Sequence, residues 1–387
     1  GTVQIIPETG LIGASWTIII KDPSRDRIDL ALNASFDTAS LSGTGVQSHR
    51  LTSDPKFDDG VTVYGVDLLP AVEVGDRIVR MSYSGVLFPT DTPYGINTVD
   101  DRKIELTVDS FWFPFDARFD SDLTATVNVR IDGEWSAVGV GAVKQTAHGH
   151  YFQQTAPALD IALSLLKDSL TVMSDDYVIY DARPEPGAKV TELEAALDSC
   201  AAYLNQLSGT AGPLPPASVI ITDRPEGGYS RGTLIALTDI ENDDEEAMRQ
   251  FICHELAHYW SKANAGGPEN WINEGVADYL ANMAIRETMG SDVFAARMAR
   301  YAEQLDGEDL PSIWTPDLTD RAPYLTLYRA GPLALYDLEQ RLGLPAFEAF
   351  MQTVMHAKPA STPHLLALLA DTHGADVRDW FAARLAE

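Results

Sequence analysis

A five-residue segment, His254-Glu255-Leu256-Ala257-His258, constrains this chain more than any other stretch of its sequence. Two histidines four residues apart project from the same face of an α-helix, so both imidazoles can bind one zinc ion. The glutamate between them then lies near the water on that zinc and can take its proton. The segment therefore predicts a helix that carries two zinc ligands, His254 and His258, and a general base, Glu255.

A candidate for the third ligand follows in the Asn-Glu-Gly sequence of residues 273–275, with fifteen residues between His258 and Glu274. This spacing leaves room for a turn and a return helix, and Gly266-Gly267-Pro268 supplies the turn. We therefore expect Glu274 to complete a site for one zinc ion per chain, with the fourth position left for water. Asp278, one helical turn later, could accept the second ring N–H of a ligand histidine. The alternative for Asp278 is an ordinary exposed acid on a helix.

Length and charge limit the classes of partner. With 387 residues, the chain is long enough for two domains. It has 28 lysines and arginines against 57 aspartates and glutamates, a net charge of −29, so we expect neither nucleic acid nor an anionic membrane surface as a partner. No apolar run is long enough to span a bilayer. The sequence leaves the oligomeric state open.

The chain has two cysteines, Cys200 and Cys253, which excludes a disulfide framework. Cys253 directly precedes His254 inside the predicted helix, so we expect it to be a buried free thiol. The chain begins with Gly1-Thr2 and no methionine. Removal of a leader would leave such a start, as would an arbitrary truncation, and we favour an exported protein.

Residues 1 to about 180 have the pattern of β structure, because apolar and β-branched runs recur between turn signals. The expected strands are Trp16–Lys21, Ile28–Phe36, Val61–Leu68, Arg77–Leu87, Lys103–Trp112 and Leu123–Ile131. Asp132-Gly133 predicts a hairpin turn. Trp112, Phe113 and Phe115 are expected to belong to the core. Many short strands at this spacing indicate an all-β sandwich or saddle-like domain.

The pattern changes near the Arg-Pro-Glu-Pro-Gly sequence of residues 183–187, which predicts one domain over residues 1–182 and a second over residues 183–387. In the second, a helix is expected from Thr191 to about Leu207, followed by strands over residues 218–222 and 232–237. Residues 242–244 then cap the motif helix, which should continue to about Lys262. From Trp271 onward nearly everything is expected to be helical. The predicted fold class is multi-domain α+β, with a mainly helical C-terminal half.

Three motifs resemble the aminopeptidase N family of gluzincin zinc peptidases. Residues 254–260 are similar to its zinc helix, residues 271–277 to its third-ligand helix, and Tyr328-Arg329-Ala330-Gly331 to its Tyr-x-x-Gly segment. The resemblance implies a β saddle followed by a thermolysin-like catalytic domain, with zinc as cofactor and a peptide as substrate. It also implies that Tyr328 stabilises the oxyanion, a role that suits a phenol O–H. A packed aromatic residue on an apolar helix is the alternative.

Two features depart from that family. It usually places eighteen residues between the second histidine and the glutamate, so the loop here should be shorter. Its Gly-x-Met-Glu-Asn strand uses the glutamate to bind the substrate's free α-amine. The corresponding residues here are Gly227, Gly228, Tyr229, Ser230 and Arg231. Ser230 lacks the charge that pairs with an ammonium, and Arg231 would oppose one if it faced the site. Asp109 or another acid of the β domain could substitute.

Together these motifs predict zinc-dependent hydrolysis of peptide bonds by an aminopeptidase-like enzyme with atypical recognition of the substrate's N-terminus. Two alternatives stay open. One is an endopeptidase, and the other is a non-catalytic, zinc-retaining protein that binds peptides. Against the second stands the presence of Glu255 and Tyr328, which only the chemistry requires.

Overall fold

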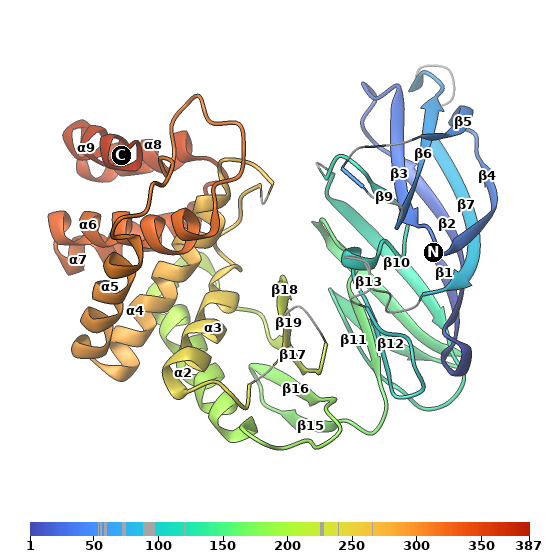
Figure 1. Ribbon diagram of the computed structural model, residues 1–387, viewed down its shortest axis with the longest axis horizontal. Helices are drawn as coiled ribbons and strands as arrows, with labels where there is room; N and C mark the ends of the chain where they lie inside the picture. Colours follow the sequence, from blue (N-terminus) through green and yellow to red (C-terminus); the bar gives the residue numbers. More distant parts are fainter. Residues whose placement is uncertain are drawn as a thin grey trace. The chain divides into compact units, whose positions relative to one another are not determined.

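The computed structural model describes the chain except for residues 53, 55, 58–59, 72–74, 88–96, 120, 225–227, 239 and 265. Strands dominate the N-terminal half and helices the C-terminal half, as Figure 1 shows. The chain forms two compact units. The first comprises Gly1–Val172, Ile179–Pro186 and Ser218–Thr238, and the second comprises Met173–Val178, Gly187–Ala217 and Asp239–Glu387. The domain boundary between residues 182 and 183 stays a prediction.

The largest sheet of the first unit has seven strands. They are β1 (Thr2–Ile6), β2 (Leu11–Ile20), β4 (Phe36–Ser42), β7 (Arg77–Val86), β10 (Leu123–Arg130), β12 (Ala142–Thr146) and β13 (Gly149–Ala158). Their order is β12-β13-β10-β1-β2-β7-β4. A 3₁₀ turn, η1 (Pro7–Thr9), joins β1 to β2. The pairs of this sheet are antiparallel except that of β1 with β10.

Two smaller sheets accompany it. One consists of β3 (Arg27–Asn33), β5 (Val46–Thr52), β6 (Val61–Leu68) and β9 (Phe115–Asp116), in the order β5-β6-β3-β9. The other consists of β8 (Lys103–Leu106), β11 (Ser136–Gly139) and β14 (Leu163–Leu166), in the order β11-β14-β8. Apolar side chains that alternate along the strands, such as Ile12 and Trp16 of β2, pack with Leu30, Trp112 and Phe113 into one core.

Two local predictions in this unit were wrong. The Asp132-Gly133 turn does not close a hairpin, because β10 pairs with β1 and β13, whereas β11 pairs with β14 in another sheet. The strand expected through Trp112 ends at Leu106. There the Thr107 side chain accepts a hydrogen bond from the Asp109 backbone N–H (3.3 Å) and caps a 3₁₀ turn, η2 (Val108–Ser110).

A five-stranded sheet follows in the sequence. Its strands are β15 (Leu170–Met173), β16 (Tyr177–Asp181), β17 (Ala217–Ile221), β18 (Tyr229–Arg231) and β19 (Leu234–Leu237). Their order is β15-β16-β17-β19-β18, with β17 parallel to β19 and β18 antiparallel to β19 at one edge. The two strands predicted here correspond to β17 and β19, and the short edge strand β18 lies between them in sequence.

Helices make up most of the second unit. They are α2 (Val190–Ser208), α3 (Glu245–Ala257), α4 (Ala277–Met289), α5 (Ser291–Leu305), α6 (Gly331–Leu342), α7 (Leu344–Ala357), α8 (Thr362–His373) and α9 (Ala375–Leu385). A 3₁₀ turn, η3 (Gly209–Ala211), follows α2, and π-helical segments η4 (Ile272–Val276) and η5 (Thr326–Ala330) precede α4 and α6. No helix formed by the described residues has the length and apolar character that crossing a membrane requires. The predicted order, a β-rich part before a mainly helical one, is confirmed.

The helix α2 agrees with its predicted amphipathic pattern, but the expectation for the cysteines was wrong. Leu193, Leu197 and Leu204 of α2 are buried, as the spacing predicts. Cys200 on the same face and Cys253 of α3 form a disulfide, with their Cα atoms 5.1 Å apart. Both side chains are fully buried. The bond therefore ties α2 to α3 inside the second unit, where we had expected a free thiol.

Candidate zinc site

The helix α3 carries His254, and His258 is the residue that caps its C-terminus. Local sequence explains where the helix begins and ends. The Asp244 side chain accepts a hydrogen bond from the Ala247 backbone N–H (2.8 Å), which caps the N-terminus. Glu245 and Glu246 in the first turn interact favourably with the helix dipole. The helix ends at Ala257, five residues before the predicted end at Lys262, because residues 258–261 tighten into turns.

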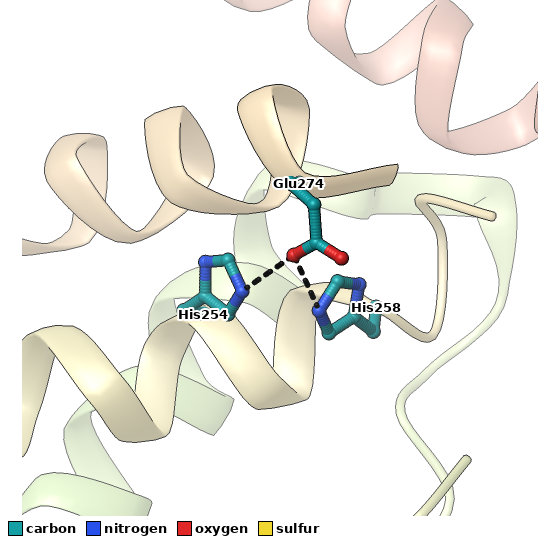
Figure 2. Close-up of side chains that lie close together, drawn as sticks. All are labelled: His254, His258 and Glu274. Atoms are coloured by element: carbon teal, nitrogen blue, oxygen red, sulfur yellow. Dashed lines mark ion pairs between the residues drawn. The ribbon is translucent and has the colours of Figure 1, made fainter. Parts of the chain in front are cut away.

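His254, His258 and Glu274 point toward one another from two successive helical segments (Figure 2). Oε2 of Glu274 lies 3.4 Å from Nε2 of His254 and 3.6 Å from Nε2 of His258. Two ligands that are each about 2.1 Å from a tetrahedral zinc ion lie about 3.4 Å apart, so these separations fit one shared ion. Among the residues that the structure describes, they form the one such group of three His, Cys, Asp or Glu ligands.

Electrostatic interactions at Glu274 and His258 favour metal binding. Burial would raise the pKa of Glu274, but the two imidazoles outweigh it and hold the pKa at about 2. Burial and the neighbouring His254 lower the pKa of His258, which favours the neutral ring that a metal requires. Burial alone would also lower the pKa of His254. The contact with Glu274 and the charges of the surrounding carboxylates outweigh burial and raise the pKa of His254. Glu274 is therefore ionised at neutral pH and supplies the negative ligand.

The residues Glu274 and Tyr328 both lie in π-helical segments, η4 and η5, which contact each other. A Cβ atom on Gly275 would lie 3.5 Å from Cα of Gly331 and 3.3 Å from the Leu327 carbonyl oxygen, so glycine permits this close approach. π-Helical turns are rare and occur often at functional sites. The crossing of η4 and η5 brings Tyr328 against Glu274.

The Tyr328 side chain faces the group of three. Its ring centroid lies 5.7 Å from that of His254, and its phenol interacts with the Glu274 carboxylate. Burial, followed by the Glu274 charge, raises the pKa of the phenol well above its usual value, so the O–H stays protonated. Glu255 is also buried, and its charge contributes to raising the pKa of both the Tyr328 phenol and His254. The structure thus brings together the five predicted residues: His254, His258, Glu274, Glu255 and Tyr328.

Asp278 is buried rather than exposed, and it lies beside a ligand histidine. Its Oδ1 is 3.9 Å from Nδ1 of His254, too far for a hydrogen bond, and that nitrogen has no hydrogen-bond partner among the residues that the structure describes. Asp278 itself accepts hydrogen bonds from Gln250 (2.7 Å), Asn282 (2.9 Å) and Tyr301 (2.9 Å). The predicted role of Asp278 at His254 stays a prediction, although its placement suits it.

Sequence reasoning overlooked the part that Asn273 plays. Its Nδ2 donates to Oε1 of Glu274 (2.9 Å), which leaves Oε2 for the histidine side. Ser261, just after α3, donates to the Ile272 carbonyl oxygen (2.6 Å) and holds the short return loop in place. The Asn-Glu-Gly motif contained the signal for Asn273, because an amide directly before a ligand carboxylate is well placed to orient it.

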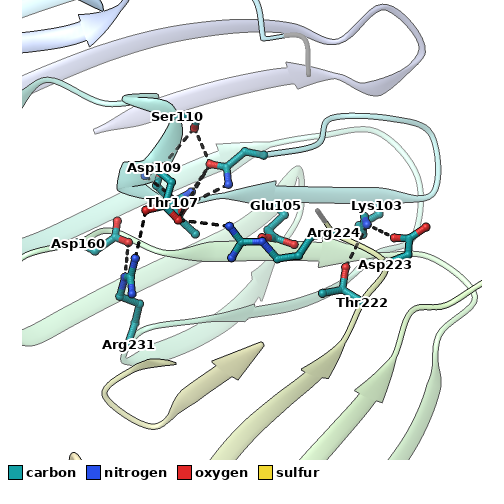
Figure 3. Close-up of polar contacts among 11 residues, drawn as sticks. Lys103, Glu105, Thr107, Asp109, Ser110, Asp160, Thr222, Asp223, Arg224 and Arg231 are labelled. Atoms are coloured by element: carbon teal, nitrogen blue, oxygen red, sulfur yellow. Dashed lines mark hydrogen bonds and ion pairs between the residues drawn. The ribbon is translucent and has the colours of Figure 1, made fainter. Parts of the chain in front are cut away.

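The residues predicted to bind the substrate backbone belong to the first unit. Gly227 lies outside the described residues, Gly228 precedes β18, and Tyr229 and Ser230 are in β18. Figure 3 shows the polar contacts of this region. Arg231 donates to Asp160 (2.8 Å) and pairs with Asp109 at 3.4 Å.

Asp109 is held from a second side as well. Arg224 lies 3.3 Å from its other oxygen and 3.2 Å from Glu105. The charge of Arg231 is therefore offset by acids of its own unit. The carboxylate of Asp109, the predicted substitute for an amine-binding glutamate, is shared between two arginines. Neither residue is a free charge.

Comparison with known proteins supports the fold. No protein-family model matches the chain. An M1 zinc metallopeptidase from Deinococcus radiodurans is similar over 100% of this chain and 91% of its own, with a TM-score of 0.71 and 18% sequence identity. A mutant of that enzyme bound to a Tyr-Ser-Ala substrate matches with a TM-score of 0.70, at 19% identity over 99% and 91% of the two chains.

A second kind of enzyme has the same architecture. Native leukotriene A4 hydrolase from Saccharomyces cerevisiae is similar over 98% of this chain and 65% of its own, with a TM-score of 0.70 and 15% identity. At these identities the similarity establishes the fold. The chain therefore has the multi-domain α+β architecture of the M1 zinc metallopeptidases, which confirms the predicted fold class.

Proposed function

We propose that this protein is a zinc-dependent peptidase. The observation that carries the proposal is the convergence of three metal-ligand atoms, on His254, His258 and Glu274, with a carboxylate and a protonated phenol at the same place. A purely structural zinc site has four protein ligands and needs neither the additional carboxylate nor the phenol. Three ligands with an acid–base residue beside them are the arrangement of a hydrolytic site.

Each residue around the zinc ligands has a separate role in the proposed hydrolysis. Bound zinc would lower the pKa of a water molecule toward about 7 and polarise the substrate carbonyl. Glu255 takes the proton of the attacking water and passes it to the leaving amine. Tyr328, protonated at neutral pH because its pKa is raised, donates its O–H to the developing oxyanion. Asn273 keeps the Glu274 carboxylate oriented.

The peptide as substrate class is supported by the shared fold. The similar Deinococcus radiodurans enzyme is known with Tyr-Ser-Ala bound as a substrate. In this chain, the short strand β18 lies at the edge of a sheet, a position to which an extended peptide could add as a further strand. Both points favour a peptide over a small non-peptide ester.

We further propose that recognition of the substrate's N-terminus does not depend on a carboxylate in β18. By its resemblance to the family motif, Ser230 corresponds to the glutamate with which that family binds the substrate's amine. Asp109 is engaged by Arg224 and Arg231, so using it for an ammonium would first require breaking these ion pairs. An ammonium without a carboxylate partner adds little affinity, because its desolvation is not offset. This reasoning favours an enzyme that tolerates blocked N-termini.

Matched pairs of peptides, one with a free and one with an acetylated N-terminus, test both proposals. Losing an ammonium that a carboxylate binds costs about 10- to 150-fold in kcat/KM. We expect less than about tenfold for this protein, and a larger preference for the free amine in the Ser230→Glu variant. Glu255→Gln serves as the inactive control against contaminating peptidases.

The other outcomes identify the alternatives. Cleavage of acetylated peptides at internal bonds, at the same rate as free ones, would identify an endopeptidase. A strict requirement for the free amine would contradict the proposed mode of recognition. If zinc-loaded protein cleaves no peptide of a mixed library, the protein is a zinc-retaining binding protein and the proposed enzyme activity is wrong.

We also propose that the protein is exported. The disulfide between Cys200 and Cys253 supports this, since such bonds persist in oxidising compartments and are rare in the cytosol. Fractionation of the source cells tests the proposal. Recovery of the protein in the cytosolic fraction with both thiols free would contradict it.

A further inference from the structure

One tyrosine, Tyr301 of α5, contacts both Asp278, beside the metal ligands, and Arg329, beside the proposed oxyanion donor Tyr328. It is 3% exposed. Its hydroxyl donates to Oδ2 of Asp278 (2.9 Å), and its ring lies under the guanidinium of Arg329, 4.4 Å from the ring centroid. Oδ1 of Asp278 lies 3.9 Å from Nδ1 of the ligand His254, and Arg329 directly follows Tyr328 in the sequence. Tyr301 therefore contacts supports of both the metal side and the oxyanion side.

On the metal side, the hydroxyl controls how the Asp278 carboxylate is held. A histidine that binds zinc through Nε2 has its proton on Nδ1 and needs an acceptor there. Within the described part of the chain, Nδ1 of His254 has no hydrogen-bond partner, and Oδ1 of Asp278 is 3.9 Å away. Tyr301 and Asn282 both donate to the other oxygen, Oδ2. They anchor the carboxylate with Oδ1 on the side of His254.

The direction of the Tyr301 hydrogen bond is set by its neighbour Arg297. Nη2 of Arg297 donates to the Tyr301 oxygen (2.9 Å), and an arginine can only donate. The hydroxyl proton is thus free to go to Asp278. Arg297 is itself fixed by Asn282 (2.6 Å) and Glu246 (3.0 Å). The donor to Asp278 is therefore preorganised by side chains of three helices.

On the oxyanion side, the ring of Tyr301 supports Arg329. Nη1 of Arg329 donates to the Tyr328 carbonyl oxygen (2.7 Å), and its Nε donates to Gln304 of α5. A guanidinium stacked on an aromatic face and hydrogen-bonded at its edge has few other positions available. The π-helical segment that carries Tyr328 is thereby attached to α5 through Arg329 and Tyr301.

We propose that Tyr301 is a positioning residue, whose hydroxyl tunes the zinc ligand His254 through Asp278 and whose ring positions Tyr328 through Arg329. The second half of this inference rests on the proposed peptidase function, whereas the first concerns zinc affinity alone. The two contacts use different parts of one side chain. Separate variants can therefore remove them one at a time.

Tyr301→Phe removes the hydroxyl and keeps the ring under Arg329. We expect zinc affinity, measured by competition with a chromophoric chelator, to fall about tenfold, the lower end for loss of a group that supports a metal ligand. Activity at saturating zinc should stay near that of the wild type. Arg329→Gln removes the stacked guanidinium. For it we expect unchanged zinc affinity and a loss of about 3- to 10-fold in kcat with KM retained.

Tyr336→Phe is a matched control, because Tyr336 lies on α6 and its ring contacts Phe294, 5.7 Å between centroids. It should leave zinc affinity and kcat unchanged. Unfolding of the zinc-free variants is measured alongside. The Tyr301→Phe variant could have a lower unfolding midpoint and still bind zinc with the affinity of the wild type. That result would mean that only packing was lost, and it would overturn the metal half of the proposal.

The oxyanion half has its own refutation. Unchanged kcat in Arg329→Gln, or a change confined to KM, would overturn it. If the wild type hydrolyses no peptide, the proposed function fails, but the chelator measurement still decides whether Tyr301 acts on the zinc site. Equal tenfold losses of zinc affinity in Tyr301→Phe and in the Tyr336→Phe control would overturn the metal half as well.

Discussion

The disulfide between Cys200 and Cys253 allows a quantitative prediction. It links positions 53 residues apart and ties α2 to α3. Closing a loop of this length removes conformational entropy from the unfolded chain that corresponds to about 4 kcal/mol at 25 °C. Both side chains are fully buried, so their replacement by alanine adds a small packing loss. We therefore expect the Cys200→Ala/Cys253→Ala variant to lose about 4 kcal/mol of unfolding free energy.

Equilibrium unfolding in urea, followed by circular dichroism, measures this difference. For a unit of this size, a loss of that magnitude also lowers Tm by about 8–16 °C. Reductant provides the internal control. It should lower the unfolding midpoint of the wild type to slightly above that of the double variant, because unfolding exposes the bond and the reduced protein keeps its buried sulfur atoms. It should leave the variant unchanged.

Two results would refute the reasoning. One is an equal unfolding midpoint for wild type and variant in the absence of reductant. The other is the detection, by mass spectrometry after alkylation, of two free thiols in protein purified without reductant. A second readout concerns the site, because Cys253 directly precedes His254. If the bond also steadies α3 in the native state, the variant will bind zinc more weakly than the wild type.

Two further predictions concern catalysis. Glu255→Gln removes the general base but no metal ligand, so we expect turnover to be abolished while zinc remains bound at one ion per chain; an active variant would refute the assigned role. Tyr328→Phe removes the donor to the oxyanion, and we expect kcat to fall about 10²- to 10³-fold with little change in KM. A change confined to KM would show that Tyr328 only binds the substrate.

Local structure around the motif could be read from the sequence with good accuracy. Asp244 caps α3 as predicted, and α2 buries the face that its apolar spacing indicated. Errors arose where turns replaced regular structure. The helix α3 ends at Ala257 because the next residues turn toward η4, and the strand after Lys103 stops at the Thr107 cap. The first end is formed by backbone turns and the second by one side-chain cap, and the periodicity of apolar residues reveals neither.

Errors of a second kind involved partners distant in sequence. The Asp132-Gly133 turn had the signature of a hairpin, but β10 pairs with β1 and β13. Strand pairing reflects how whole sheets pack, and a turn dipeptide expresses only a local preference. The same holds for Cys200 and Cys253, whose pairing requires α2 to lie against α3.

By itself, the sequence determined that His254 and His258 share one helix face, that Glu255 lies between them, and that strands precede helices along the chain. These properties follow from helical geometry and hydrophobic patterning, which act over a few residues. Only the tertiary structure decided that Glu274 and Tyr328 meet those histidines. Their meeting depends on the close crossing of η4 and η5 at Gly275 and Gly331, a contact between segments far apart in sequence.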